Sequence, residues 1–371
     1  MTALRSTAAR LFGEMADPVE GAPPADLVLA PTTVEEAARI LDFASEHGLA
    51  VVVWGGGTHQ GLGYRIEPDL LLVTTRMDRI VDWQPDDLTV VVEPGLPVAA
   101  LEARLDERSQ SAVLPERPGA ATVGGVVAAG ASGWRRYRYG PTRDRVLEVV
   151  VATGDGRVVR GGAQVVKNVT GYDIPRLVTG SLGSLGLIGR VCLKLWPKGE
   201  TTTTVRVDDP SRALEIAYRP LAVLETATGC FAYLAGTERE VAAQGAALGG
   251  SVQEGLLWPE HPTGEVVVSV RVPPASTAEA VRRLPAPDSF VAGHGVGEVN
   301  ASFDSINPSE LEGLRDWAES TGGAMVLLAA PDGFALDPWG TPPQTLDLQR
   351  RIKAGFDPAG VMAPGRLPGG L

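Results

Sequence analysis

The feature that most constrains the fold is a glycine cluster directly behind an apolar strand. Residues 49–54 (LAVVVW) have the composition of a buried strand and run without a break into residues 55–63 (GGGTHQGLG). Glycine lets the backbone turn sharply and lets other groups approach the main chain closely. A flexible surface turn would also tolerate glycine. Five glycines in nine residues behind a buried strand instead favour a cradle whose N–H groups face an anion such as a pyrophosphate.

This cradle differs from two familiar phosphate loops. It lacks the Gly-Lys-Ser/Thr of a Walker loop. Its spacing G-G-G-x-x-x-G-x-G also departs from the Rossmann fingerprint, and no clear helix follows it.

The predicted strand at residues 49–54 is the second strand of a β-α-β unit, whose first strand is predicted at residues 26–31. Between them, residues 33–47 predict a helix with a Thr33–Glu36 capping box and Gly48 at its end.

Composition limits the classes of function. A chain of 371 residues with 44% hydrophobic and 21% charged residues should form packed domains. Its net charge of −12 argues against non-specific nucleic-acid binding, which needs a basic face. The two cysteines, Cys192 and Cys230, form no CxxC pattern, so we expect packed thiols in a reduced, cytoplasmic protein. We expect no signal peptide and no membrane-inserted segment.

The pattern predicts three segments along the chain. Composition changes at residues 197–204 (PKGETTTT), so we place one domain at 1–199 and a cap at 200–344. Strand-like and helix-like stretches alternate in the cap with a β-α-β-β-α-β-like rhythm, typical of an α+β unit. Residues 345–356 predict a helix, and we expect segment 345–371 to return to the first domain.

Three further motifs follow the glycine cradle. Residues 118–133 (PGAATVGGVVAAGASG) are small, which suits either close approach to a flat ligand or a tightly packed helix. Residues 140–156 contain TRDRVLEVVVATGDG, and residues 165–188 contain VVKNVTGYD followed by LVTGSLGSLGLI. Each motif alone is weak, but their order and spacing together are specific.

In this order the motifs resemble the FAD-binding domain of the vanillyl-alcohol-oxidase (PCMH-type) superfamily. Residues 162–187 are most similar to the FAD-binding E subunit of bacterial glycolate oxidases. The resemblance covers residues 25–200 and resumes at 356–366 (FDPAGVMAPGR). It implies an α+β fold, in which a two-subdomain PCMH-type FAD-binding domain carries a smaller α+β cap, and it implies FAD as the cofactor.

The resemblance also implies roles for individual residues. It assigns the FAD pyrophosphate to Gly55, Gly56, Gly57, Thr58, His59 and Gly61. It assigns the lining of the flavin and its phosphates to Pro118, Gly119, Thr122, Gly124 and Gly125. It places Arg143 and Val146 by the nucleotide, Ile188 at the adenine end, and Lys167, Asn168, Gly171 and Tyr172 near the isoalloxazine. The catalytic candidates are Tyr172, His294 and Arg366, the last of which would close the tail beside the site.

Histidine usage separates this chain from some members of that superfamily. Some bind FAD covalently through a histidine in the glycine loop, but His59 is ambiguous in register by one position, so we expect non-covalent FAD. Members that oxidise D-2-hydroxy acids carry a histidine-rich metal site in the cap. This chain offers only His261 and His294 there, so we expect no metal site. Ala363 stands where the family tail usually has Asn.

Three functions follow as alternatives. The first is an accessory or electron-relay FAD subunit of a glycolate-oxidase-type 2-hydroxy-acid dehydrogenase complex. Its partners would be a larger FAD-binding dehydrogenase subunit and an iron–sulfur subunit, with any membrane contact made through them. The second is a self-sufficient FAD oxidase or dehydrogenase of a small alcohol or hydroxy acid, and the third is a structural subunit that has lost FAD. Residues 134–139 (WRRYRY) are either a solvated loop or a segment that docks a partner or lies at the flavin edge.

Overall fold

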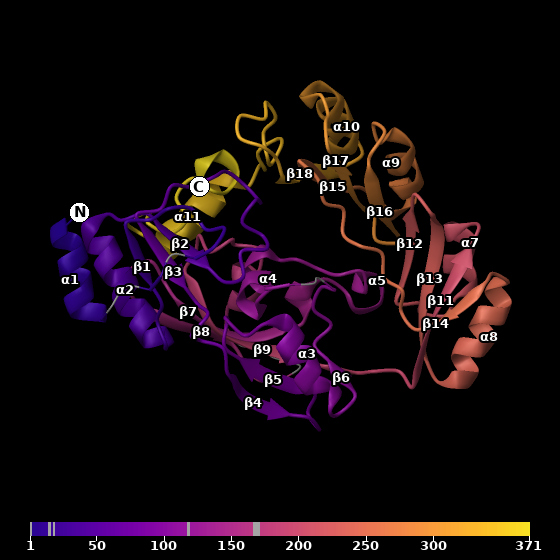
Figure 1. Cartoon of the computed structure of the whole chain (residues 1–371), viewed down its shortest axis with the longest axis horizontal. Coiled ribbons are helices and arrows are strands. Elements are labelled where there is room, and N and C mark those ends of the chain that lie inside the picture. The colour runs from indigo at the N-terminus through magenta and orange to yellow at the C-terminus, as the bar shows by residue number, and fades with distance from the viewer. Residues whose placement is uncertain (1, 14–15, 18, 117–118, 166–170) are drawn as a thin grey trace.

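The computed structural model describes residues 2–13, 16–17, 19–116, 119–165 and 171–371. Its sheets fall into two groups (Figure 1). Three smaller sheets lie with both chain termini at one end of the molecule, and one large sheet lies at the other end. We call the first group, together with the C-terminal helix, the N-terminal body, and we call the large sheet with its helices the cap.

A three-stranded parallel sheet launches the glycine cradle. Its strands lie in the order β1 (Leu27–Leu29), β3 (Leu70–Val73), β2 (Val51–Trp54). The predicted β-α-β unit is therefore present, with β3 inserted between its two strands. The connecting helix α2 (Val34–His47) buries its apolar face against this sheet, and α1 (Thr2–Phe12) packs on α2.

The ends of α2 follow the predicted capping pattern in part. The Thr33 side chain accepts a hydrogen bond from the Glu36 N–H, and Gly48 adopts φ 64° after the last turn. The carboxylate of Glu36 reaches back to the N–H and hydroxyl of Thr32, one residue before the position that a capping box requires.

An antiparallel sheet of five strands forms the second part of the N-terminal body. The order is β4 (Ile80–Gln84), β5 (Thr89–Val92), β9 (Leu187–Lys194), β7 (Val146–Ala152), β8 (Val158–Gly162). Its core also takes side chains from α3 (Val98–Asp106), α4 (Val123–Ala129) and α6 (Ile174–Val178). A short pair, β6 (Gln110–Ser111) with β10 (Trp196–Pro197), lies where the chain leaves this body.

The cap is one eight-stranded antiparallel sheet. From edge to edge its strands are β14 (Val252–Glu254), β11 (Thr201–Val207), β13 (Gly229–Gly236), β12 (Ala222–Thr226), β16 (Ser289–His294), β17 (Glu298–Phe303), β15 (Val266–Arg271) and β18 (Ala324–Ala329). Its helices are α7 (Pro210–Ile216), α8 (Glu238–Leu248), α9 (Thr277–Arg283) and α10 (Pro308–Ser320), which cover its outer face (Figure 1).

The cap contains the predicted rhythm twice. Both β11-α7-β12-β13-α8-β14 and β15-α9-β16-β17-α10-β18 read β-α-β-β-α-β, and each half has the strand order 4-1-3-2. The two halves join through β12 and β16, which pair in antiparallel fashion. Because all four helices cover one face, the other face of this sheet is left to meet the N-terminal body.

The end of the chain returns to the N-terminal body. Helix α11 (Leu346–Phe356) lies near the first sheet (Figure 1), and the following segment pairs with β2. The Val51 N–H donates to Val361 O at 2.8 Å, and the Ala363 N–H donates to Val51 O at 2.9 Å. The tail is thereby held against the strand that leads into the glycine cradle.

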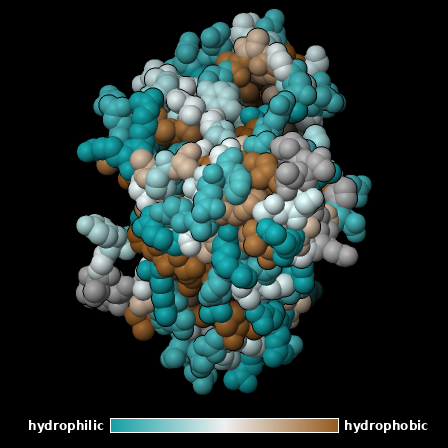
Figure 2. Space-filling model, turned by 90° about the vertical axis from the view of Figure 1, so that its left-hand side faces the viewer, coloured by the Kyte–Doolittle hydropathy of each residue, from teal (hydrophilic) through white to brown (hydrophobic). Residues whose placement is uncertain are grey.

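One face of the outer surface is shown in Figure 2. The face at the N-terminal end is a mosaic in which hydrophilic side chains surround scattered apolar patches (Figure 2). None of the helices in the described ranges has the length and apolar character needed to cross a bilayer.

Candidate functional site

The glycine cradle is shaped by close backbone approach. A Cβ on Gly55 would collide with the Thr122 hydroxyl, and one on Gly56 would collide with the Ala120 carbonyl. Gly57 has φ +73°, and a Cβ there would lie 2.7 Å from the Trp54 ring. Neighbouring atoms therefore exclude a side chain at all three positions, and at Gly57 the backbone conformation disfavours one as well.

The second small-residue motif forms the opposite wall. Thr122 caps α4, and its side chain accepts a hydrogen bond from the Gly125 N–H. Gly124 lies so close to Pro94 that a Cβ would collide with the proline. The segment is thus a tightly packed helix, which was one of the two interpretations of this motif. It also presents bare backbone to a cavity, as close approach to a ligand would require.

A cavity of about 650 Å³ lies between these two loops. We call it the glycine cavity. Leu182, Gly183 and Ile188 form part of its far side. Leu182 has φ 52°, a left-handed conformation that is costly for leucine and that often marks a functional site. Bare backbone on two sides fits the diphosphate and flat rings of an FAD.

Arg366 closes the glycine cavity from the tail. Its Nη1 donates to Gln60 Oε1 and its Nη2 to Gln60 O, each at 2.7 Å, and its Nε donates to Leu62 O at 3.2 Å. The guanidinium therefore ties the C-terminal tail to the glycine-rich loop. Burial lowers the pKa of Arg366 to about 10, so it stays charged at neutral pH.

A second cavity of about 810 Å³, the cap chamber, adjoins the first. His59 and Ala129 line both. The register of the cap strands explains which cap residues line this chamber. Leu224, Gly293, Glu298 and Arg271 stand in one row across β12, β16, β17 and β15, and all four line the chamber. Ser269 and Asn300 form a second facing pair two residues away, since alternate residues share a face.

Charge in the cap chamber is concentrated around Glu298. Arg136 Nη1 lies 3.0 Å from Glu298 Oε2, and Arg271 Nε lies 4.0 Å from Glu298 Oε1. Ser269 Oγ donates to the same carboxylate at 3.3 Å. Two guanidinium groups thus share one carboxylate, which leaves the wall with a net positive charge.

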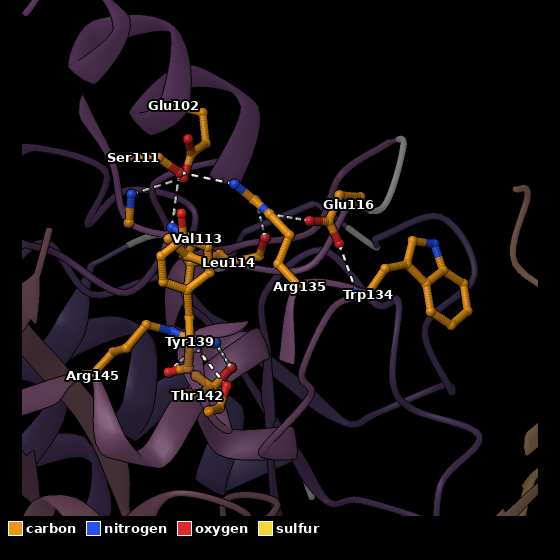
Figure 3. Close-up of polar contacts among 12 residues, drawn as sticks. Glu102, Ser111, Val113, Leu114, Glu116, Trp134, Arg135, Tyr139, Thr142 and Arg145 are labelled. Carbon is orange, nitrogen blue, oxygen red and sulfur yellow. Dashed lines mark hydrogen bonds and ion pairs between the residues drawn. The ribbon is translucent and has the colours of Figure 1, made fainter. Parts of the chain in front are cut away.

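The basic and aromatic segment 134–139 connects the N-terminal body with the cap. Arg135 turns back to the Ser111 hydroxyl, the Leu114 carbonyl and the Glu116 carboxylate, while the Trp134 ring points away (Figure 3). Trp134 stacks on His261 with ring centroids 4.4 Å apart. Arg136 binds Glu298, so side chains of this segment fasten the cap. The side chains of Trp134, Arg135 and Arg136 thus make contacts within the chain, whereas docking of a partner by this segment stays a prediction.

The histidines occupy different environments. His59 lies where the two cavities meet, with its Nδ1 3.0 Å from Thr58 Oγ1. His261 lines the cap chamber, and its Nε2 lies 3.0 Å from the Glu116 carbonyl O. Because a carbonyl only accepts, Nε2 of His261 carries the proton in that contact.

The structure does not bring His294 into the chamber. His294 pairs across strands with Val223, whose side chain packs under α7 and α8. It therefore points to the helix-covered face, where its Nε2 lies 2.7 Å from Glu225 Oε2. In the described ranges, no group of three or more His, Cys, Asp or Glu side chains is arranged to hold a metal ion.

Other candidates also lie apart from the two cavities. Tyr172 is 90% exposed, Arg143 points to solvent beside Asp144, and Val146 is packed in the core of the five-stranded sheet. Gly119 and Gly171 line neither cavity, and Gly61 instead approaches the Leu328 carbonyl of the cap. Pro118, Lys167 and Asn168 lie outside the described residues.

The cavities also bring in residues that sequence reasoning did not select. Gln60 lies inside the glycine-rich motif, so its position in the sequence could have identified it as a residue of the cavity. Leu182 and Gly183 lie in the GSLGSLG motif, which carries the left-handed residues of the far side. Arg271, Glu298 and Asn300 gave no local signal, because only strand pairing puts them on one face.

Comparisons with known proteins agree with this geometry. A family model described as an FAD binding domain matches residues 25–162. Glycolate oxidase subunit GlcE of Escherichia coli is 29% identical over 85% of this chain and 92% of that protein. Glycolate oxidase subunit GlcD of Bacillus subtilis is 38% identical over 48% of this chain, and D-lactate dehydrogenase of Archaeoglobus fulgidus is 31% identical over 50%.

The matched share of each relative limits what the comparisons show about this chain. The matches span 39% of the GlcD chain and 42% of the D-lactate dehydrogenase chain. A solved alkyldihydroxyacetonephosphate synthase aligns with a TM-score of 0.64 at 14% identity, covering 92% of this chain and 76% of its own. That structure supports the shared fold alone. Residues 25–162 therefore form an FAD-binding domain, and the chain as a whole is similar to the glycolate oxidase subunit GlcE.

Proposed function

We propose that this chain is the FAD-binding subunit of a glycolate-oxidase-type dehydrogenase complex, with an accessory or electron-relay flavin. The observation that carries the proposal is the adjoining pair of cavities, which share His59 and Ala129. A cofactor on the glycine cradle thus has a chamber beside it for a second molecule. When bound, FAD supplies the capacity to accept a hydride or electrons.

The chain's own residues favour a small carboxylate in that chamber. Arg136 and Arg271 stand against a single carboxylate, Glu298, in a protein whose net charge is −12. A guanidinium binds a carboxylate through two parallel N–H groups. In the proposed function, these groups bind and orient a 2-hydroxy acid or its 2-oxo product, and the docked cap limits the access of water.

Membership of a complex rests on the relatives. The likeness to GlcE extends over most of both chains, and GlcE is named as a subunit of glycolate oxidase. We propose a larger FAD-binding subunit similar to GlcD as one partner. The proposed iron–sulfur centre belongs to another partner, because two buried cysteines in this chain are too few to bind a cluster.

The second candidate function is a self-sufficient FAD oxidase or dehydrogenase. The observation that favours it is that His59 and His261 both line the cavities beside the proposed flavin, where a base would be needed. The accessory role is preferred because His261 and His294, the two histidines of the cap, face opposite sides of its sheet.

Affinity purification of the tagged chain from its native host tests the proposal. We expect a yellow preparation that contains FAD, together with a larger FAD-binding chain and an iron–sulfur chain. A colourless preparation without other chains would support the loss-of-flavin alternative, and a yellow preparation of this chain alone would favour the self-sufficient enzyme.

A further inference from the structure

Arg366 is a buried cation without a matching anion. Only 5% of the residue is exposed, and its guanidinium donates to neutral oxygens of Gln60 and Leu62. None of the ion pairs among the described residues involves Arg366. A buried charge that lacks an opposite charge is unfavourable, so its retention calls for an explanation.

Two other buried arginines provide a comparison. Burial lowers the pKa of Arg145 to about 10, but Glu116, Asp144 and Glu102 act in the opposite direction. Burial likewise lowers the pKa of Arg315, and Asp337 and Glu319 oppose it. For Arg366, burial is the cause of the lowered pKa, and no carboxylate opposes it. None of these three arginines makes an ion pair among the described residues, and Arg366 is the one of the three that lines the glycine cavity.

The position of Arg366 indicates where the anion lies. It lines the glycine cavity, and no Asp, Glu or Lys is among the described residues that line this cavity. A guanidinium has five N–H donors, of which three make the hydrogen bonds to Gln60 and Leu62. One N–H on each of Nη1 and Nη2 is left over, and guanidinium N–H groups bind phosphate oxygens well.

We infer that Arg366 is the cation that binds the diphosphate of FAD in the glycine cavity, and that it does not act on the substrate. The glycine loops offer backbone dipoles to an anion but no formal charge. Arg366 supplies that charge, and it is held for this purpose by Gln60 within the same glycine-rich loop. Cofactor binding therefore also fixes the C-terminal tail.

Ligand affinities of the apoprotein test the inference without any activity or partner. FAD, ADP and adenosine are titrated calorimetrically into the wild-type protein, Arg366→Gln, Arg366→Lys and the control Arg145→Gln. Arg145 is a suitable control because it is equally buried but lines neither cavity. We expect wild-type protein to bind ADP at least about tenfold more tightly than adenosine, since only ADP carries the diphosphate.

The variants should separate charge from structure. Arg366→Gln should weaken FAD and ADP by about 10- to 100-fold and leave adenosine unchanged, whereas Arg366→Lys keeps a cation and should retain most of the affinity. Arg145→Gln should leave the ratio of ADP to adenosine affinity at the wild-type value.

Three results would overturn the inference. They are equal affinity of the wild-type protein for ADP and adenosine, wild-type FAD affinity in Arg366→Gln, or equal losses for ADP and adenosine in that variant. The first result needs no variant, so the inference can fail even if Arg366→Gln does not fold. Since no measurement uses a hydroxy acid, its failure is distinct from failure of the proposed function.

Discussion

At the scale of the residue, Gly57 links the sequence motif most directly to cofactor binding. Its φ of +73° and its contact with the Trp54 ring leave no room for a side chain, and its backbone faces the glycine cavity. Two separate effects would follow a substitution here, one on the backbone conformation and one on the contact with the Trp54 ring.

Gly57→Val should therefore abolish FAD binding while leaving a soluble protein. A β-branched residue at positive φ costs about 1–3 kcal/mol, and its Cβ would collide with the Trp54 ring, so the cradle backbone that faces the cofactor must shift. The matched control is Gly249→Val, because Gly249 has φ +72°, lies in the cap and has open space around it. FAD content measured after purification should fall only in the first variant. Full occupancy in Gly57→Val would mean that the cradle is placed wrongly.

His59 is the residue through which a covalent link to FAD would form. It lies where the glycine cavity meets the cap chamber, next to the Thr58 hydroxyl. We predict non-covalent FAD, so acid precipitation should leave the yellow colour in the supernatant. A yellow pellet, with a mass increase on the peptide that contains His59, would contradict this prediction.

At the scale of the element, the cap sheet supplies the chamber wall. The row from Leu224 to Arg271 crosses four strands, and the helices cover the opposite face. Segment 134–139 fastens this wall to the N-terminal body through the Trp134–His261 stack and the Arg136–Glu298 ion pair. The wall is thus placed by side chains that come from both parts of the chain.

Arg271→Gln should weaken binding of a small dicarboxylate such as oxalate by about tenfold, because a hydrogen-bonded guanidinium contributes about 1.5–3 kcal/mol to binding a carboxylate. The control is Arg282→Gln, since Arg282 lies on α9 at the opposite face and pairs with Glu279. Titration of the FAD-loaded protein, followed by the flavin difference spectrum, measures both. Equal oxalate affinity in the wild-type protein and Arg271→Gln would remove Arg271 from the site.

Features that depend on local conformation could be predicted from the sequence, whereas features that depend on strand pairing could not. The α2 helix and the glycine cradle were predictable because Thr33, Gly48 and residues 55–63 act through local conformation. The doubling of the cap rhythm was not predicted from the sequence, although the second half carries signals too, since Asn307 and Pro308 begin α10 and Gly322 follows its end. His294 is a candidate because of its glycine-rich neighbours, but strand register decides its face, and that register depends on pairing with β12, which is far away in sequence.

At the scale of the whole molecule, the two parts of the chain meet around adjoining cavities. The N-terminal body offers bare backbone and one buried cation, and the cap offers a polar wall with a net positive charge. In the proposed function, this arrangement holds a flavin and admits a small carboxylate. The histidines of the cap face different sides of its sheet, which limits the proton chemistry available to the isolated chain.

Anaerobic stopped-flow reduction of the purified FAD-loaded chain tests the accessory role most directly. Glycolate and D-lactate are mixed with the protein, with and without added divalent metal, and flavin absorbance is followed. Efficient oxidation needs a base and a cation held together against the flavin, so we predict slow or no bleaching by either acid when no partner is present. Rapid and saturable bleaching of the flavin in the isolated chain would contradict the accessory role and establish a self-sufficient enzyme.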